Sequence, residues 1–248
     1  MNYLFFLFFL ITSLMGEEIY ATFDVVAARE ANLALTASGV VKTLRADVGS
    51  HVQKGAILLE IDNDDLVAGV ALAEQSLKKA QVEEQFARQT YDRYKKVENV
   101  IDAELMDQQT LGYQKASAAL GEAKAQVRYK NTLVEKTRLR APFSGVISER
   151  NVQLGDGVGG GTMSLFKLIS SPDAKLMIRF DEKYIPSVKK GSVLRYRVDG
   201  ESGYRRGTIN KLYPSVDPKT RKATAEVLVS GISPGLFGEA YISSENAK

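Results

Sequence analysis

The chain has 248 residues, no cysteine, one histidine and a formal net charge of +3. Without cysteine, disulfides, zinc–thiolate sites and cysteine nucleophiles are excluded. The small net charge does not point to nucleic acid as a partner. The length is sufficient for one or two ordinary hydrophobic cores.

The first 16 residues contain no charged side chain and read as a signal peptide. Their apolar run from Leu4 to Leu14 is too short to span a bilayer comfortably and suits a secretory signal. Gly16 is a small residue that fits cleavage before Glu17. The usual Lys or Arg at the start is missing, however, and Leu14 is large for its place. We expect the signal to be removed and the mature protein to be exported and soluble.

The next stretches predict strands. Residues 17–38 are rich in β-branched and aromatic side chains and predict two strands. Residues 39–63 and 136–170 each contain short apolar runs separated by glycine turns. They predict two halves of one small β-sandwich, with the chain between them inserted at a loop.

Residues 64–135 predict a long antiparallel helical hairpin. Apolar residues recur at alternating steps of four and three, and then every seven, which is the pattern of a coiled-coil seam. A short interruption at residues 99–102 makes each helix the antiparallel partner of the other. At 1.5 Å per residue each arm is about 50 Å long. The predicted seam residues include Leu66, Val70, Leu77, Tyr91, Met106, Tyr113, Leu120 and Val127.

Three carboxylates, Asp62, Asp64 and Asp65, surround the start of the first helix. Such a group can indicate a metal site or acid–base chemistry, but acidic and Asn side chains also favour helix starts. We interpret the run from Asp62 through Asn63 to Asp64 as helix capping.

Residues 155–160 match the spacing G-x-G-x-x-G of phosphate-binding loops. That motif binds phosphate only between a strand and a helix. The following run, from Met163 to Ile169, predicts a strand, so we interpret these glycines as turn residues.

From Leu176 onward the pattern predicts a β-barrel, which residues 17–38 are expected to complete. Residues 185–191 predict a short helix or turn. The predicted strands are Leu176–Phe180, Val193–Val198, Gly207–Tyr213, Lys222–Val229 and Gly238–Ile242.

The sequence contains no common catalytic motif. G-x-S-x-G, H-E-x-x-H and the Walker lysine loop are all missing. His51 is the only histidine and lies between Gly49 and Gly55 in a predicted turn. We therefore predict no enzymatic activity, no cofactor and no metal site.

The order of these segments resembles the periplasmic adaptor proteins, or membrane fusion proteins, of tripartite efflux pumps of the resistance-nodulation-division type. The split sandwich resembles the lipoyl/biotinyl carrier domain. The resemblance covers about residues 17–242. Its more specific pieces are Gly49–Gly55, Leu139–Ile147, Val216–Arg221 and Pro234–Gly238.

The resemblance implies a mainly β, elongated multidomain fold with a coiled-coil α-helical hairpin. Its expected parts are a signal peptide (1–16), a β-barrel domain (17–38 and 171–248), a lipoyl-like domain (39–63 and 136–170) and the hairpin (64–135). The membrane-proximal domain of larger members is expected to be truncated or absent.

The resemblance also implies a function in the periplasm. Adaptors bridge an inner-membrane transporter to an outer-membrane channel and self-associate into a ring, which implies a trimer or hexamer here. The implied activity is export of drugs or other small toxic compounds. The alternatives are an adaptor of an ATP-driven exporter or of type I protein secretion, and an enzyme or carrier subunit with a lipoylated or biotinylated lysine.

At the hairpin tip the family places an Arg, a Leu four residues later, and a Ser at the start of the second helix. Arg93 and Val97 match the first two positions, with Val in place of Leu. Asp102 stands in place of Ser and can cap the second helix. The resemblance therefore implies that Arg93, Val97 and Asp102 contact the outer-membrane channel. The competing interpretation is that they are ordinary solvated residues.

Overall fold

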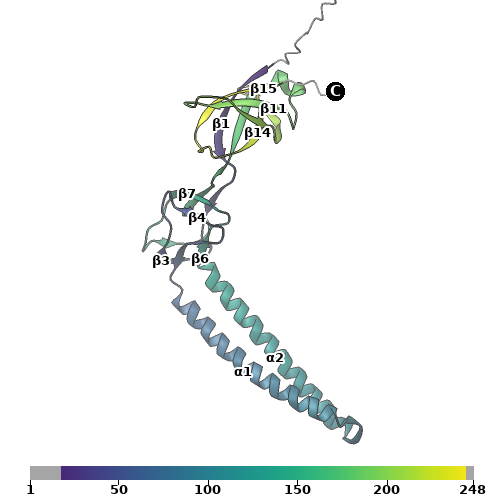
Figure 1. Ribbon diagram of the computed structural model, residues 1–248. Coiled ribbons are helices and arrows are strands. Elements are labelled where there is room, and N and C mark those ends of the chain that lie inside the picture. The colour runs from purple at the N-terminus through teal and green to yellow at the C-terminus, as the bar shows by residue number, and fades with distance from the viewer. Residues whose placement is uncertain (1–17, 244–248) are drawn as a thin grey trace, which may run out of the picture. The chain divides into compact units, whose positions relative to one another are not determined.

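The computed structural model describes residues 18–243, which form two compact units (Figure 1). The first contains the described residues up to Ala31 and those from Ile169 onward, and the second contains Asn32–Leu168. The predicted signal peptide, residues 1–16, lies outside the described residues. Among the described helices, none has the length and apolar character needed to cross a bilayer.

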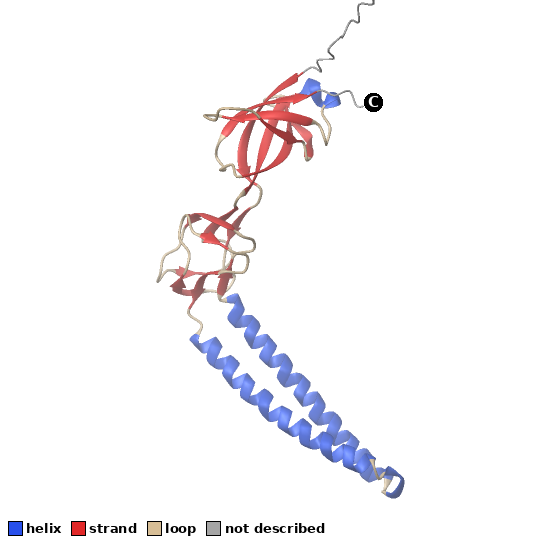
Figure 2. Ribbon diagram, in the orientation of Figure 1, coloured by secondary structure: helices blue, strands red, loops and turns tan. Residues whose placement is uncertain are grey.

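The first unit is a seven-stranded antiparallel sheet with the strand order β12-β11-β15-β1-β10-β14-β13 (Figure 2). Its elements are β1 (Glu18–Ala27), β10 (Asp173–Asp181), the 3-10 helix η2 (Glu182–Ser187), β11 (Val193–Val198), β12 (Arg205–Thr208), β13 (Lys211–Asp217), β14 (Lys222–Ser230) and β15 (Phe237–Ser243).

Alternation along these strands puts one face inside and the other in water. On β1, for example, Ile19 and Phe23 are fully buried while Tyr20 is 56% exposed. The two edge strands, β12 and β13, are joined by residues 209–210 alone, and Gly207 of β12 lies against the Val227 side chain of β14. The sheet therefore curls into a barrel around one apolar core, as the sequence predicted.

Two strand predictions need correction. The predicted strand Gly207–Tyr213 is two strands, β12 and β13, because the chain turns at Ile209 and Asn210 to bond with residues of other strands. Of the two strands predicted within residues 17–38, only β1 joins the barrel. The second, β2 (Glu30–Leu33), belongs to a sheet with β9, β7 and β4.

The second unit contains two four-stranded sheets, with orders β2-β9-β7-β4 and β6-β5-β3-β8. Leu58, Ile147 and Phe166 come from three different strands and are all fully buried. The strands are β3 (Gly39–Leu44), β4 (His51–Val52), β5 (Ile57–Ile61), β6 (Arg138–Arg140), β7 (Gly145–Arg150), β8 (Gly157–Val158) and β9 (Phe166–Ser170).

The glycine-rich segment forms turns. Gly155, Gly159 and Gly160 have φ angles of 89°, 150° and 77°, a region that residues with a Cβ rarely adopt. The next regular element is strand β9 and not a helix. The segment therefore lacks the helix N-terminus that a phosphate-binding loop requires.

Two long helices interrupt the sheet β6-β5-β3-β8 between β5 and β6 (Figures 1 and 2). They are α1 (Asp64–Lys95, 32 residues) and α2 (Ala103–Lys136, 34 residues), with the 3-10 turn η1 (Glu98–Val100) between them. Since β5 and β6 are antiparallel neighbours, with Leu59 opposite Leu139, the hairpin stands where a short turn would otherwise join them.

Candidate functional site

The root of the hairpin is fixed to the sheet by a buried polar network. Asn63 is 5% exposed, and its amide donates to Glu60 Oε1 and to Thr137 Oγ1, both at 2.8 Å. The Thr137 hydroxyl donates to the Val134 carbonyl, and Arg138 Nε donates to Glu60 at 2.9 Å. One set of bonds thereby joins the end of β5, both helix ends and β6.

The carboxylates of this network are held in their charged form. Burial of Glu60 opposes ionisation, but hydrogen bonds from Arg138 and Asn63 outweigh it and lower the pKa of Glu60. Glu135 accepts hydrogen bonds from Arg140 Nη2 at 2.9 Å and from Arg138 Nη1 at 2.8 Å. The bond from Arg140 and then that from Arg138 lower the pKa of Glu135 despite some desolvation.

The expected capping of α1 is partly wrong. Asn63 occupies the N-cap position but makes no side-chain cap, because its amide is committed to the network. The Asp64 N–H donates to Asp62 Oδ1 at 3.4 Å. Lys42 on β3 pairs with both Asp62 and Asp64.

The seam of the hairpin is continuous from root to tip. Tyr91 stacks on Tyr113 near the tip, with ring centroids 5.4 Å apart, and a Cβ built on Gly69 near the root would contact Lys130. These contacts place α1 and α2 antiparallel along their length. The predicted seam residues Leu66, Val70, Leu77, Tyr91, Met106, Tyr113, Leu120 and Val127 are all half-buried.

The tip carries the three residues that the resemblance marks for a partner. Asp102 is the N-cap of α2 and accepts a hydrogen bond from the Glu104 N–H at 2.9 Å. Arg93 is exposed, and its guanidinium donates a hydrogen bond to Thr90 Oγ1 at 3.2 Å. Val97 is 44% exposed. The three side chains therefore present a donor, an apolar surface and a carboxylate to solvent.

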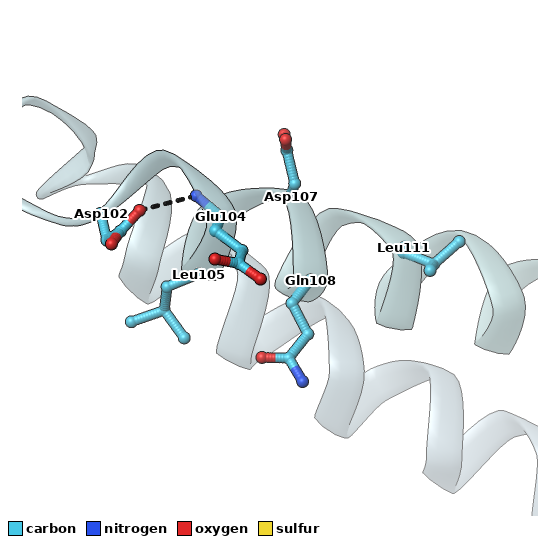
Figure 3. A pocket seen from close by; sticks show the side chains of 6 residues that line it. All are labelled: Asp102, Glu104, Leu105, Asp107, Gln108 and Leu111. Atoms are coloured by element: carbon cyan, nitrogen blue, oxygen red, sulfur yellow. Dashed lines mark hydrogen bonds between the residues drawn. The ribbon is translucent and has the colours of Figure 1, made fainter.

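Shallow grooves on both helices surround these residues. Grooves on α1 are lined by Phe86, Gln89, Thr90, Asp92, Arg93, Tyr94, Lys96 and Val97. The groove on α2 is lined by Asp102, Glu104, Leu105, Asp107, Gln108 and Leu111 (Figure 3). The α2 groove contains three carboxylates and no basic side chain, whereas Arg93 and Lys96 make the α1 side basic.

Sequence reasoning named Arg93, Val97 and Asp102 but missed the other groove residues. Phe86 and Leu111 are apolar but fall outside the seam pattern, and this feature of the sequence could have marked them as groove residues. An apolar residue away from the seam is solvent-exposed unless a partner covers it.

The described residues offer little for cofactor chemistry. Among them, no group of three or more His, Asp or Glu side chains is arranged to hold a metal. His51 is exposed on β4, and Asp65 is exposed in the first turn of α1.

Comparison with known proteins places the chain in a family. The model of the CzcB-like barrel-sandwich hybrid domain matches residues 29–168. The cobalt-zinc-cadmium resistance protein CzcB of Cupriavidus metallidurans is 29% identical over 221 residues, which is 81% of this chain and 40% of that protein. The multidrug efflux pump subunit AcrA of Escherichia coli is 30% identical over 149 residues, or 59% of this chain and 38% of that protein.

Solved structures share the fold. ZneB from Cupriavidus metallidurans has a TM-score of 0.54 at 20% identity and covers 92% of this chain and 98% of that one. MacA from Actinobacillus actinomycetemcomitans has a TM-score of 0.68 at 16% identity, over 93% and 79% of the two chains. The chain spans about 40% of the length of the first curated relatives. Since the family model matches more than half of it, the chain belongs to the CzcB-like barrel-sandwich hybrid family, which confirms the resemblance to membrane fusion proteins of efflux pumps.

Proposed function

We propose that this protein is a periplasmic adaptor that bridges an inner-membrane efflux transporter of the resistance-nodulation-division type to an outer-membrane channel. In this proposal residues 39–63 and 136–170 form a lipoyl-like domain, residues 64–135 form a coiled-coil hairpin, and the described part of residues 17–38 and 171–248 contains the barrel domain. The chain acts without enzymatic chemistry, as a connector.

One observation carries the proposal, which is the hairpin inserted between β5 and β6. Two helices of 32 and 34 residues extend from a sheet that a short turn would close. Each helix is about 50 Å long, and most of its surface is exposed. Such an arm contributes little to the core of its own domain, so we assign it to reaching a partner.

In the proposed complex the tip residues Arg93, Val97 and Asp102 contact the outer-membrane channel. Arg93 is suited to this role because a guanidinium donates to backbone carbonyls and carboxylates in a fixed geometry. Several copies of the chain form the ring through which the transporter and the channel are joined.

The cargo belongs to the transporter and not to the adaptor. The names of the relatives refer to cobalt, zinc and cadmium resistance in one case and multidrug efflux in another. We propose that the pump served by this adaptor exports toxic metal cations, drugs or other small toxic compounds.

Deleting the gene in its source strain tests the proposal. The deletion strain is expected to become sensitive to at least one divalent metal or drug, and the wild-type gene is expected to restore resistance. Unchanged sensitivity across metals and drugs, with protein confirmed in the parent strain, would contradict the efflux function.

The intact mass of the purified protein tests the competing carrier function. We expect the mass of the unmodified chain, because the hairpin occupies the place of the turn that presents the modified lysine in carrier domains and Asp65 stands at the aligned position. An added lipoyl or biotinyl group on any lysine would overturn this expectation.

A further inference from the structure

One end of the barrel brings together several segments that are far apart in the sequence. β1 begins where β10 ends, because Thr22 of β1 pairs with Arg179 of β10. Asp181, the last residue of β10, pairs with Lys222, the first residue of β14. The turn between β13 and β14 therefore lies at this end. So does η2, the short helix beside the barrel strands in Figure 2. We call it the η2 end of the barrel.

β11 also begins at the η2 end. Its Leu194 pairs with Ile242 of β15, and Ile19 near the start of β1 pairs with the same residue. The loop between η2 and β11 is short, and the Lys189 N–H donates to Ser192 Oγ within it at 3.0 Å. The loop is thereby fixed beside the starts of β1 and β11.

The η2 end is basic. It carries six exposed basic side chains, which are Lys183, Lys189, Lys190, Lys219, Arg221 and Lys222. In the described part of the chain none of the six forms an ion pair. The same segments carry three carboxylates, those of Asp181, Glu182 and Asp217. Asp181 and Asp217 accept hydrogen bonds from nearby backbone N–H groups. Positive charge therefore predominates at this end.

Tyrosine rings form a band on the outer wall of the barrel beside the η2 end. Tyr20 and Tyr241 pair across β1 and β15 with ring centroids 5.6 Å apart, and Tyr204 lies 6.0 Å from Tyr241. The Arg195 guanidinium lies over the rings of Tyr204 and Tyr241 at 4.9 and 4.7 Å. It also pairs with Glu18 at 2.6 Å. Tyr20 is 56% exposed and Tyr204 is 43% exposed, so the rings stay accessible while the charges among them are neutralised.

The chain enters the barrel at the η2 end. The apolar run from Leu4 to Leu14 precedes β1, which begins at Glu18. The four residues from Leu14 to Glu18 span at most about 14 Å of extended chain. Until the predicted signal is removed, the start of β1 is therefore the part of the barrel held closest to the bilayer.

These features are those of a peripheral membrane contact. Lys and Arg side chains near a surface of anionic lipid are attracted to it. Tyr is enriched at the level of the lipid headgroups, because its ring is apolar and its hydroxyl is polar. Ile185 and Val193 are 36% and 47% exposed at the η2 end and add apolar area that a bilayer surface can cover.

We propose that the η2 end of the barrel binds the surface of a bilayer that contains anionic phospholipid. The six basic side chains contact the headgroup phosphates, and the tyrosine band lies at the level of the headgroups. The proposed function gives this end of the barrel no partner, so the contact adds a second attachment to that of the transporter.

Sedimentation with lipid vesicles tests the contact. The exported protein, purified from the source strain, is expected to bind vesicles of phosphatidylcholine with about 30 mol% phosphatidylglycerol at least about tenfold more tightly than vesicles of phosphatidylcholine alone. Raising the salt concentration from about 0.05 M to about 0.5 M is expected to release it, because salt screens the attraction. Equal binding to both kinds of vesicle, or binding to neither, would overturn the membrane contact.

Charge reversal tests which surface binds. Lys189→Glu combined with Lys190→Glu is expected to weaken binding to the anionic vesicles about tenfold or more, with an unchanged circular dichroism spectrum. Lys78→Glu combined with Lys79→Glu is the matched control, since these are two consecutive exposed lysines on α1. Lys189→Arg combined with Lys190→Arg keeps the charge and should keep the binding. Equal losses in the two Glu variants would show that net charge, and not the η2 end, determines binding.

A tyrosine substitution tests the apolar part of the contact. Tyr20→Ala is expected to weaken binding to the anionic vesicles about threefold or more, because it removes apolar area from the headgroup region. Leu228→Ala is the control, since Leu228 is also 56% exposed on the barrel wall but pairs with Lys175 near the start of β10, away from the η2 end. An effect of Leu228→Ala as large as that of Tyr20→Ala would contradict the placement of the tyrosine band.

Resistance of the complemented deletion strain separates the membrane contact from the proposed function. If the gene confers no resistance while its product binds anionic vesicles as expected, the efflux function fails and the membrane contact stands. If Lys189→Glu with Lys190→Glu abolishes resistance while the wild-type protein binds no vesicles, the η2 end contacts a protein of the complex and the membrane contact is overturned.

Discussion

Asn63 illustrates how one side chain determines where the hairpin joins its domain. Its two amide hydrogens are divided between Glu60 at the end of β5 and Thr137 at the end of α2. The start of α1, the end of α2 and strand β5 thus share one buried amide. Water cannot fully replace the Asn63 amide, because its partners Glu60 and Thr137 are also largely buried.

Replacing Asn63 by Ala is expected to destabilise the protein by about 1–3 kcal/mol, because it leaves buried polar groups without their partner. Urea unfolding, monitored by circular dichroism, measures the change in the free energy of unfolding. Asn131→Ala is the control, since Asn131 is exposed on α2 and its loss is expected to change stability by no more than about 0.5 kcal/mol. Equal effects of both substitutions would contradict the role assigned to the network.

The same network predicts a dependence on acid. The pKa values of Glu60 and Glu135 are lowered in the folded protein. A carboxyl with a lowered pKa stabilises the fold above its unfolded pKa, near 4.3, and this contribution is lost as pH falls through the folded value.

We therefore expect the free energy of unfolding to fall as pH drops from about 5 toward 3. Glu60→Gln should reduce the stability at pH 7 and flatten this decline, because glutamine does not titrate in this range. Urea titrations at several pH values measure both effects. A decline equally steep in Glu60→Gln and wild type would show that Glu60 does not cause it.

At the tip, Arg93→Asp is expected to abolish export while leaving the fold intact. The residue is exposed, so stability should change by about 0.5 kcal/mol or less. At a docking contact the same change removes charge-assisted hydrogen bonds worth about 1.5–3 kcal/mol each. Resistance of the complemented deletion strain and tip-to-channel cross-linking give the result. Export and cross-linking at wild-type levels would show that the tip residues are assigned wrongly.

At the scale of the element, the hairpin is stabilised by its seam rather than by its surface. The seam positions are half-buried or, at Ala73, Ala80 and Val134, buried, while most other positions on α1 and α2 are exposed. Helices of this length in water depend on packing of the apolar face for most of their stability.

Leu77→Asp is expected to destabilise the hairpin by about 2–3 kcal/mol, since it places a charge in the seam and removes apolar contact. Leu72→Asp makes the same chemical change at a position that is 71% exposed, and its effect on stability should be about 0.5 kcal/mol or less. Thermal unfolding monitored at a helix-specific wavelength compares the two. A larger loss in Leu72→Asp would mean that the seam has been misassigned.

In the molecule as a whole, the hairpin is an insertion in the second compact unit, between β5 and β6. Residues 62–136 interrupt an antiparallel pair of strands in which the Ile61 N–H already donates to the Thr137 carbonyl at 3.1 Å. A two-residue Asn-Gly turn is suited to such a pair.

A chain with Asn-Gly in place of residues 62–136 is expected to fold with its β content retained and to fail in export. Circular dichroism and urea unfolding report on folding, and resistance of the complemented deletion strain reports on function. Retained export would show that the hairpin is not the connecting arm.

The main elements could be predicted from the amino-acid sequence, because each of them depends on a local period. The seam spacing from Leu66 to Val127 predicted both long helices, and the alternation in residues 173–243 predicted most barrel strands. These patterns are readable since a helix or strand exposes one side at a regular interval. The order of the segments then identified the family.

The way in which distant segments combine became visible only in the folded chain. The fold placed β2 outside the barrel, divided the predicted strand at Ile209 and Asn210, and assigned Asn63 to a network instead of a cap. Each outcome depends on partners many residues away, such as Thr137 for Asn63. It also showed that Phe86 and Leu111 remain exposed, because exposure depends on what packs against a residue, and no local period records that.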